Sequence, residues 1–372
     1  MAQKSEYQGQ AFLREQVLKQ GLCTGCAACV GLCPYQGFYK DRTAVIHQCD
    51  REGGRCQAYC PRGPLELAEM KAALYEAQDL TPEIGACKGL YITRAADPGI
   101  RQKAQHGGTV SALVALALSS GLIDTAVLAG KDQKLQSRGI SAHNASDVVE
   151  AAGSKFAVSP TVAQFNQASL GSAQAIGAVA TPCQAMALAK MRHAPQPGDE
   201  DRIAKLKLVI GLFCGWALDY EALRELIEAE AKGAQILGMD IPPSKHQCME
   251  LYTDQGTIEI PIDKVQKVVR ESCDYCHDLT CEFADLSVGG SRSPEGWEVD
   301  KGWNQVIVRS EAGQKLLDLA REQGVLEFKE VPEGNLAKLK KAAANKKAAC
   351  LENLHAQFGD DREAIYLRNE EA

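Results

Sequence analysis

The sequence contains no long hydrophobic run and no excess of positive charge. No apolar stretch approaches the roughly 18 residues that are needed to cross a bilayer, and the polar residues 1–20 lack the apolar core of a secretory signal. Its 41 Lys and Arg residues face 48 Asp and Glu residues, a net charge of −7, whereas nucleic-acid-binding domains are usually basic. These absences predict a cytoplasmic protein that has no membrane span and binds no nucleic acid.

Two sequence patterns are also missing. No G-x-G-x-x-G follows a predicted strand, so the dinucleotide-binding fingerprint is absent. No internal repeat appears beyond two cysteine motifs. The contents of 45% hydrophobic and 24% charged residues are ordinary for a globular protein, and 372 residues allow two or three domains of roughly 100–200 residues each.

Cysteine, by contrast, is abundant and unevenly placed. The chain has 15 cysteines, and seven of them fall between Cys23 and Cys60. In a chain expected to stay in a reducing compartment, clustered cysteines indicate metal or redox chemistry rather than disulfides.

The first cysteine motif has the spacing C-x2-C-x2-C-x3-C-P, formed by Cys23, Cys26, Cys29, Cys33 and Pro34. This spacing is typical of bacterial ferredoxins that bind 4Fe–4S clusters, in which the fourth cysteine of one motif serves the other cluster. A zinc ribbon is the alternative, but zinc sites favour two C-x2-C pairs that are separated by a longer spacer.

A second, altered motif follows, with the spacing C-x6-C-x3-C-P. The ferredoxin arrangement assigns Cys23, Cys26, Cys29 and Cys60 to a first cluster and Cys33, Cys49 and Cys56 to a second. The second cluster has no evident fourth ligand. Asp50, Glu52 and the distant Cys87 are candidates, and a three-iron cluster, which needs no fourth ligand, is the alternative.

After residue 85 the pattern changes to alternating strands and helices. A helix is predicted over residues 65–78, broken by Thr81-Pro82, and a second helix opens at Gly107-Gly108-Thr109 and ends at Gly121. Strands are predicted at 124–130, 175–180, 207–213, 256–262 and 304–309, and further helices at 220–232 and 336–368. This alternation predicts an α/β or α+β domain.

A further cysteine group is predicted within that domain. Cys183 and Cys214 each follow a predicted strand, and the carboxyl ends of neighbouring parallel strands lie close together. Cys273 and Cys276 add a C-x2-C pair, so these four cysteines together could form a four-thiolate site. The alternative is that Cys183 and Cys214 are small buried hydrophobic residues, and Cys281 is near enough in sequence to be a rival ligand.

Six segments in this region resemble the beta-subunit family of coenzyme F420-reducing hydrogenases and dehydrogenases. They occur in the family's order between residues 100 and 341, which is far more specific than any single motif. The segments are 105–113 (QHGGTVSAL), 151–156 (AAGSKF), 182–184 (PCQ), 211–214 (GLFC), 273–276 (CDYC) and 293–297 (SPEGW). Arg292 and residues 298–303 depart from the family pattern.

The resemblance implies FAD and a 4Fe–4S cluster in this domain. Its cluster ligands would be Cys183, Cys214, Cys273 and Cys276. Its FAD contacts would be Gly107, Gly108, Thr109, Ser111, Gly153, Ser154, Lys155, Ser291, Ser293, Gly296 and Trp297. Lys155 would suit the FAD pyrophosphate as a point charge. No catalytic acid or base is assigned, because hydride transfer to a flavin does not require one.

We therefore expect three parts. They are a small ferredoxin-like α+β iron–sulfur domain (1–85), an α/β (α+β) flavin-binding domain that also holds a 4Fe–4S cluster (86–335), and a helical tail (336–372). The lysine-rich run 338–347 in the tail is typical of a solvated helix face, and a docking surface for an acidic partner is the alternative.

The expected function is that of a flavin and iron–sulfur oxidoreductase subunit. With FAD and two to three 4Fe–4S clusters it would pass electrons between a hydride carrier such as coenzyme F420 and one-electron partners. It would belong to a hydrogenase, formate dehydrogenase or heterodisulfide-reductase-like complex, with ferredoxin or coenzyme F420 as carrier. The alternatives are a ferredoxin-dependent reductase of a small organic substrate and a non-catalytic electron conduit.

Overall fold

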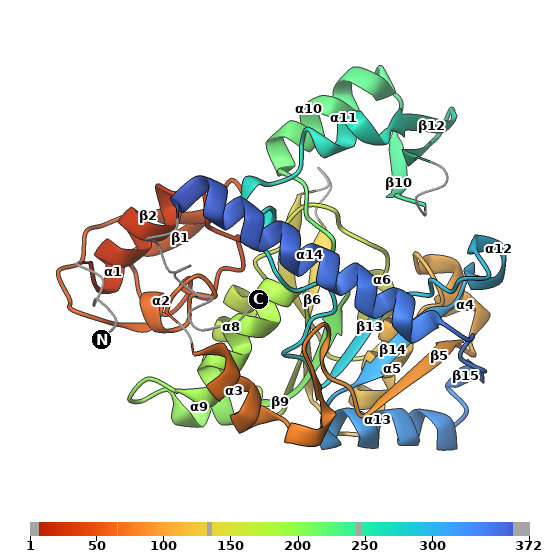
Figure 1. Cartoon of the computed structure of the whole chain (residues 1–372), viewed down its shortest axis with the longest axis horizontal. Coiled ribbons are helices and arrows are strands. Elements are labelled where there is room, and N and C mark those ends of the chain that lie inside the picture. The colour runs from red at the N-terminus through yellow and green to blue at the C-terminus, as the bar shows by residue number, and fades with distance from the viewer. Residues whose placement is uncertain (1–6, 65, 132–135, 243–246, 360–372) are drawn as a thin grey trace.

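The computed structural model describes residues 7–64, 66–131, 136–242 and 247–359. Its largest feature is a mixed sheet of eight strands (Figure 1). The central strands β13, β9, β8 and β6 run parallel, and the other neighbours are antiparallel. In spatial order the strands are β15 (Leu326–Lys329), β5 (Gly89–Ala95), β14 (Asn304–Val308), β13 (Leu286–Gly290), β9 (Leu206–Leu212), β8 (Ile176–Ala180), β6 (Thr125–Lys131) and β7 (Ser137–Ala142).

Helices cover both faces of this sheet. Alternate side chains along each strand point to opposite faces, and the two faces pack against different helices. On one face, Leu208 and Ile210 of β9 pack with helices α5 (Thr109–Ser119) and α13 (Glu311–Glu322). On the other face, Val209 packs with α7 (Thr161–Leu170) and α8 (Pro182–His193). The predicted α/β class is therefore confirmed.

The strands expected from the sequence in this region all form. The structure confirms the helices expected at α5 and α10 (Tyr220–Ala231). The helix expected over 65–78 is shorter, because α3 (Leu67–Leu74) ends at the extended residue Tyr75 and only a 3-10 turn (Ala77–Asp79) follows; residue 65 lies outside the described residues. Strands β8 and β9 are parallel neighbours with Ala180 opposite Gly211, so the segments that follow them meet, as predicted.

A three-stranded meander stands apart from the large sheet. It consists of β10 (Ile236–Asp240), β11 (Cys248–Thr253) and β12 (Gly256–Pro261), and it packs with α10 and α11 (Ile262–Gln266). Met249, Leu251 and Ile260 form its small core together with Leu223 and Ile227 of α10. In Figure 1 this green unit lies beyond one end of the sheet.

The N-terminal segment shares its core with the large sheet. Phe12 and Leu22 pack in the same hydrophobic cluster as Met186 and Val209. The expected ferredoxin-like fold and the boundary near residue 85 stay predictions. The elements here are α1 (Gly9–Phe12), a π-helix (Leu13–Leu18), the hairpin β1 (Gln36–Tyr39) and β2 (Arg42–Val45), α2 (Arg55–Ala58), α3, and the short pair β3 (Leu80–Thr81) and β4 (Gly85–Ala86). Elsewhere, short helices form at α4 (Pro98–Lys103), α6 (Ala145–Glu150), α9 (Glu200–Ala204), α12 (Trp297–Asp300) and a 3-10 turn (Glu271–Cys273).

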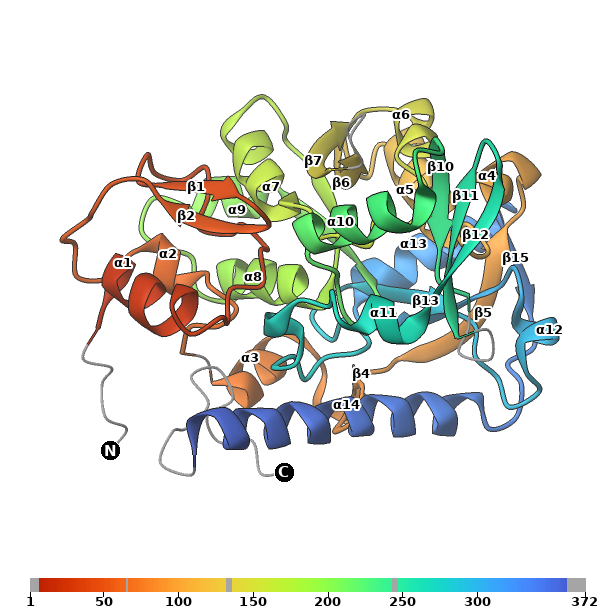
Figure 2. The same ribbon diagram turned by 90° about the horizontal axis from the view of Figure 1, so that it is seen from above.

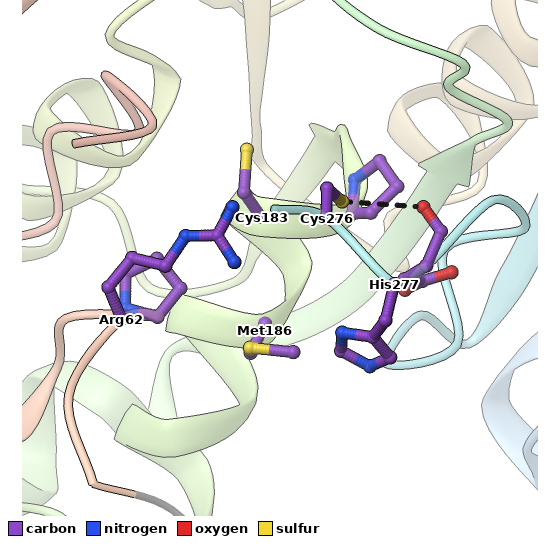
Figure 3. A pocket seen from close by; sticks show the side chains of 8 residues that line it. Arg62, Cys183, Met186, Cys276 and His277 are labelled. Atoms are coloured by element: carbon purple, nitrogen blue, oxygen red, sulfur yellow. Dashed lines mark hydrogen bonds between the residues drawn. The ribbon is translucent and has the colours of Figure 1, made fainter. Parts of the chain in front are cut away.

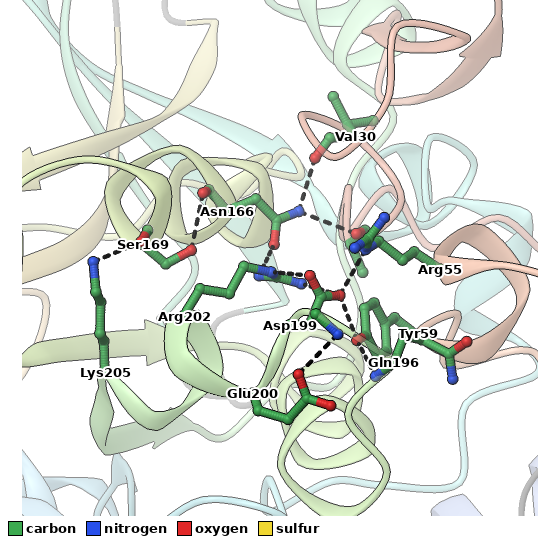
Figure 4. A network of polar contacts seen from close by, with 12 residues as sticks. Val30, Arg55, Tyr59, Asn166, Ser169, Gln196, Asp199, Glu200, Arg202 and Lys205 are labelled. Carbon is green, nitrogen blue, oxygen red and sulfur yellow. Dashed lines mark hydrogen bonds and ion pairs between the residues drawn. The ribbon is translucent and has the colours of Figure 1, made fainter.

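A buried polar network ties the N-terminal segment to α9 (Figure 4). The Asp199 carboxylate accepts hydrogen bonds from Arg55 Nε (2.7 Å), Tyr59 Oη (2.7 Å) and Arg202 Nε (2.8 Å). Burial alone would raise the pKa of Asp199, but the bonds from Arg202, Arg55 and Tyr59 hold it well below its usual value. The Asn166 amide extends the network by donating to the carbonyl of Val30 (2.8 Å).

The long helix α14 (Asn335–Phe358) runs along one side of the molecule (Figures 1 and 2). The helical tail is confirmed to Phe358, and residues 360–372 lie outside the described part. The expected solvated lysine face is wrong for half-buried Lys346 and Lys347, which contact the chain itself. Among the described helices, none is both long and apolar enough for a bilayer crossing.

Candidate cysteine and flavin sites

Four cysteines from three segments, which we call the cysteine tetrad, meet at the carboxyl edge of the parallel strands. β8 leads into Cys183 in the first turn of α8, and Cys214 follows β9. The turn Glu271–Cys273 brings Cys273 and Cys276 to the same place. Burial, together with the nearby thiols of Cys276 and Cys183, raises the pKa of Cys273 to about 11. Burial also raises the pKa of Cys214, with Cys273, Cys183 and Cys276 adding to the effect.

Three sulfurs of the tetrad make long hydrogen bonds with backbone groups. Cys214 Sγ donates to the carbonyl of Trp216 and Cys276 Sγ to that of Asp278, each at 3.6 Å. The Ala217 N–H donates to Cys273 Sγ at 3.3 Å. Four convergent sulfur donors fit a 4Fe–4S cluster, and a structural zinc ion accepts the same donor set. The residues therefore fit the predicted cluster, and their role as ligands stays a prediction.

Four N-terminal cysteines form the first ferredoxin set: Cys23, Cys26, Cys29 and Cys60. The backbone is left-handed at Gly25 (φ 70°) and Ala27 (φ 60°), which turns the loop tightly. Burial raises the pKa of Cys29, and the thiols of Cys26, Cys60 and Cys23 raise it further. These four cysteines therefore lie near one another, and their role as ligands of one cluster stays a prediction.

The second ferredoxin set, Cys33, Cys49 and Cys56, is less closely grouped. Burial, together with the thiol of Cys33, raises the pKa of Cys56 to about 11. Cys33 is exposed and its Sγ donates to Gln36 Oε1 at 2.6 Å. Among the described contacts, none joins Cys49 to this pair. The second cluster and its fourth ligand stay predictions.

The first ferredoxin set and the tetrad are neighbours. Burial raises the pKa of Cys26, and the next largest cause is the thiol of Cys183. The Arg62 guanidinium donates to the carbonyl of Ser272 (2.8 Å), just before Cys273, and to that of Tyr275 (2.6 Å), between the two cysteines of the C-x2-C pair. Figure 3 shows Arg62 beside Cys183, where both line a cavity of about 10 Å³. Through these hydrogen bonds, Arg62 of the N-terminal segment holds the loop that carries Cys273 and Cys276.

A buried cation lies beside the first ferredoxin set. Lys190 of α8 is 6% exposed, and its Nζ donates to the carbonyls of Cys60 (2.8 Å) and Pro64 (3.2 Å). Burial lowers the pKa of Lys190 to about 8, against the opposite effect of Cys60 and Cys26. Helix α8 thus supplies Cys183 to the tetrad and Lys190 to the first ferredoxin set.

Asn304 joins the first predicted flavin segment to strand β13. Its Oδ1 accepts the N–H of Thr109 (3.2 Å) at the start of α5, and its Nδ2 donates to the carbonyl of Gly289 (3.1 Å). A Cβ atom at Gly107 would lie 2.8 Å from Asn304 Oδ1, so this close approach requires glycine. The other predicted contacts of this segment, Gly108 and Ser111, lie beside Thr109 at the start of the helix.

Gln105 joins the predicted segment 153–155 to the same region. The Ser154 hydroxyl donates to Gln105 Oε1, and Gln105 Nε2 donates to Asp240 Oδ1 (2.5 Å) on β10. The Lys155 ammonium donates to three backbone carbonyls after α6, among them that of Gly153 (2.8 Å). The proposed contact of Lys155 with a pyrophosphate stays a prediction.

Asp300 supports the third predicted flavin segment. Its Oδ1 accepts from the Ser291 hydroxyl (2.7 Å), and its Oδ2 accepts from the Ser293 N–H (2.6 Å). Asp300 ends α12, within the stretch that departs from the family pattern, so this stretch stabilises the loop. Gly296 has a left-handed φ of 99°. The side chain of Trp297 lies outside the described part of the structure.

Two aromatic rings pack against the glycines of β13. A Cβ atom at Gly290 would lie 2.8 Å from His106 Nε2, and one at Gly289 would lie 2.2 Å from the ring of Phe213. Because Phe213 directly precedes Cys214, its ring joins the tetrad to β13, the strand that leads into the third predicted flavin segment at Ser291.

Two family models match this arrangement. The N-terminal part of the coenzyme F420 hydrogenase/dehydrogenase beta subunit matches residues 90–166, and its C-terminal part matches residues 173–334. The chain belongs to this family. The assignment made from six sequence segments is thereby confirmed. Both models begin after the N-terminal cysteines and end before α14.

Individual relatives agree with this beta-subunit assignment. The coenzyme F420 hydrogenase subunit beta of Methanothermobacter thermautotrophicus is 31% identical over 281 residues, which are 74% of this chain and 96% of the relative. A coenzyme F420-dependent sulfite reductase of Methanocaldococcus jannaschii is 25% identical over 341 residues, 88% of this chain and 50% of the relative. A chain of the F420-reducing NiFe hydrogenase complex of Methanosarcina barkeri superimposes with a TM-score of 0.67 at 27% identity, covering 74% of this chain and 94% of that chain. These names support the predicted oxidoreductase class.

Four cysteines of this chain belong to none of the three predicted sets. Cys281, the rival ligand, is fully buried and lies close to the tetrad: burial raises its pKa, and the nearby thiols of Cys183 and Cys214 add to the effect. Its Sγ donates to the carbonyl of Ala180 (3.6 Å), and a Cβ atom at Gly211 would lie 2.5 Å from it. Cys87 packs with Ile84 and Ile307, which does not bring it to the second ferredoxin set. Cys248 lies on β11 and Cys350 is buried on α14.

The sequence reasoning missed the residues that support these groups: Arg62, Lys190, Asp300, Asn304 and Lys346. All but Asp300, whose partners lie seven and nine residues away, join segments that are far apart in sequence, so no local spacing could reveal them. The one available signal was Asn304 at the first position of a predicted strand, and this position does not indicate which groups the Asn304 amide contacts.

Proposed function

We propose that this chain is the electron-transferring subunit of a coenzyme F420-dependent oxidoreductase complex and holds FAD and iron–sulfur clusters. The observation that carries the proposal is the convergence of Cys183, Cys214, Cys273 and Cys276. Phe213 links this group to β13, the strand before the third predicted flavin segment. The relatives supply the coenzyme, because the beta subunit of a coenzyme F420 hydrogenase and an F420-dependent sulfite reductase are among them.

When bound, FAD accepts two electrons as a hydride and passes them singly to iron–sulfur clusters. The chain's own residues support a linear order for these groups. Phe213 joins Cys214 to β13, which leads into the third flavin segment, and Cys183 is close to Cys26. Cys56 is close to both Cys60 and the exposed Cys33. The order is therefore flavin segments, tetrad, first ferredoxin set and second ferredoxin set, which ends at the surface.

The burial of three cysteines of the first ferredoxin set serves this role. Cys26, Cys29 and Cys60 are each no more than 7% exposed. A dry surrounding protects sulfur ligands from oxidation and limits electron loss to small oxidants in solvent. The exposed Cys33 marks the place where a one-electron partner, such as a ferredoxin or another subunit of the complex, would exchange electrons.

The first test is anaerobic purification followed by iron, sulfide and flavin analysis. We expect one FAD and roughly 8–12 iron atoms per chain, as two to three clusters require, and bleaching of the flavin absorbance by reduced coenzyme F420. Absence of flavin would contradict the proposal and favour a non-catalytic electron conduit.

A pair of variants tests the tetrad itself. Cys273→Ala should lose about four iron atoms per chain because it removes a proposed ligand. Cys281→Ala is the matched comparison, since Cys281 is the rival ligand beside Cys183 and Cys214, and it should keep its iron. Equal iron loss in both variants would show that the assigned ligand set is wrong.

A further inference from the structure

Helix α14 brings a lysine to the cysteine tetrad from outside the family's matched region. The family models end at residue 334, and α14 begins at Asn335. Lys346 lies in the middle of this helix, and its Nζ donates to the carbonyls of Cys214 (2.7 Å) and Gly215 (2.9 Å). The lysine therefore reaches the loop that carries one tetrad cysteine.

The same helix also contacts the other half of the tetrad. Asn353 Nδ2 donates to the carbonyl of Asp274 (2.9 Å), between the two cysteines of the C-x2-C pair. The ring of Phe358 packs on Tyr275 at 5.9 Å between centroids. Buried Leu339, Cys350 and Leu354 lie at helical spacing on the packed face of α14. Because these contacts span the helix, Lys346 is held in place rather than free to swing away.

The Lys346 side chain brings a positive charge to the loop that carries Cys214. Its two hydrogen-bond acceptors are carbonyls, which carry no net charge. Neighbouring lysines differ, because Lys347 pairs with Glu282 (2.6 Å) and Lys340 pairs with Glu83 (3.3 Å).

We infer that Lys346 is a positioning residue that raises the midpoint potential of the cluster held by the tetrad. Reduction adds negative charge to a cluster, and a fixed cation nearby stabilises the reduced form more than the oxidised form. The effect is strong where the surroundings are buried, since water screens the charge less there. This inference rests on the proposed function, because it requires a cluster at the tetrad.

The test is a redox titration of the intact, anaerobically purified chain, followed by electron paramagnetic resonance. The tetrad signal is first identified as the one that Cys273→Ala loses. Lys346→Gln removes the charge and keeps an N–H donor for the carbonyls, whereas Lys346→Arg keeps the charge. Lys341→Gln is the matched control, because it removes the same charge from an exposed position on the same helix.

We expect Lys346→Gln to shift the tetrad midpoint potential to a more negative value by at least a tenfold change in the reduction equilibrium, which is about 59 mV for one electron. Lys346→Arg and Lys341→Gln should leave it near the wild-type value, and the other signals should not move in any variant. An unchanged tetrad potential in Lys346→Gln, or an equal shift in Lys341→Gln, would overturn the inference.

Iron analysis of the same samples separates this outcome from a failure of the proposed function. If Cys273→Ala loses no iron and no signal, then no cluster is present at the tetrad and the proposed function fails. If Lys346→Gln loses the cluster, the comparison moves to Lys346→Arg and Lys346→Met. Loss of the cluster from the charge-retaining Lys346→Arg variant as well would show that Lys346 holds the loop and does not act through its charge.

Discussion

At the scale of single residues, His106 shows how burial creates a pH-sensitive contact. Its ring lies against Gly290 beside the predicted flavin segments. Burial, reinforced by the positive charge of Arg292, lowers the pKa of His106 to about 4 from an ordinary value of 6.5. The folded chain therefore holds a neutral imidazole where the unfolded chain would take up a proton.

The sign of the resulting pH dependence follows from this difference. Between pH 6.5 and 4 the unfolded chain binds more protons at this site, so stability is present above pH 6.5 and is lost as the pH falls. We expect the free energy of unfolding to fall by about 1–2 kcal/mol from pH 7 to pH 5, since each pKa unit corresponds to about 1.4 kcal/mol. Urea titrations at pH 7, 6 and 5 would measure it.

The matched variant is His106→Gln, whose side chain does not titrate. Its stability at pH 7 is expected to be lower, but its slope between pH 7 and 5 should be shallower than that of the wild type. A wild-type slope retained in His106→Gln would assign the pH dependence to other groups.

At the scale of elements, α8 and α9 connect the N-terminal segment to the rest of the chain. Helix α8 carries Cys183 in its first turn and Lys190 two turns later, one for each cysteine group. The loop before α9 carries Asp199, which holds Arg55 and Tyr59 of the N-terminal segment. These contacts position the first ferredoxin set against the tetrad.

Asp199→Ala should therefore weaken this attachment. It leaves the Arg202 guanidinium, whose side chain is 6% exposed, without the carboxylate partner that it meets at 2.8 Å. Removing one partner of a buried ion pair costs about 3–5 kcal/mol. We expect a clear fall in the urea midpoint, whereas the exposed neighbour in Asp201→Ala should cost less than about 0.5 kcal/mol. Similar midpoints for the two variants would contradict this account.

At the scale of the whole molecule, the proposed function orders the cysteine groups along a path from the flavin segments to the surface. We predict that electrons must pass through the first ferredoxin set on their way from the tetrad to the second ferredoxin set. Cys29→Ala removes a proposed ligand there, so electrons would have to cross a longer gap between the tetrad and the second ferredoxin set. Rapid-freeze measurements after mixing with reduced coenzyme F420 would follow each cluster.

We expect flavin and tetrad reduction in Cys29→Ala at wild-type rates, and reduction of the second ferredoxin set at least tenfold slower. The control is Cys350→Ala, which changes a buried cysteine on α14 that belongs to no group. Unchanged reduction of the second set in Cys29→Ala would place that set on a different route.

Much of this architecture could be predicted where chemistry depends on local spacing. The ferredoxin motif predicted that Cys60 joins Cys23, Cys26 and Cys29, and these four cysteines lie near one another. The placement of Cys183 and Cys214 after strands predicted their meeting, because β8 and β9 are parallel neighbours. The expected solvated lysine face is wrong for Lys346 and Lys347. Which side of a helix is buried depends on the neighbouring elements that it packs against.

By itself the sequence determined the family, the core strands and which cysteines could act together, because strand periodicity and ligand spacing are local properties of the chain. Only the tertiary structure decided which side chains tune and support these groups. Lys190 and Lys346 reach their cysteines across 130 and 132 residues, and a charge acts through space, where its effect depends on distance and burial rather than on order along the chain.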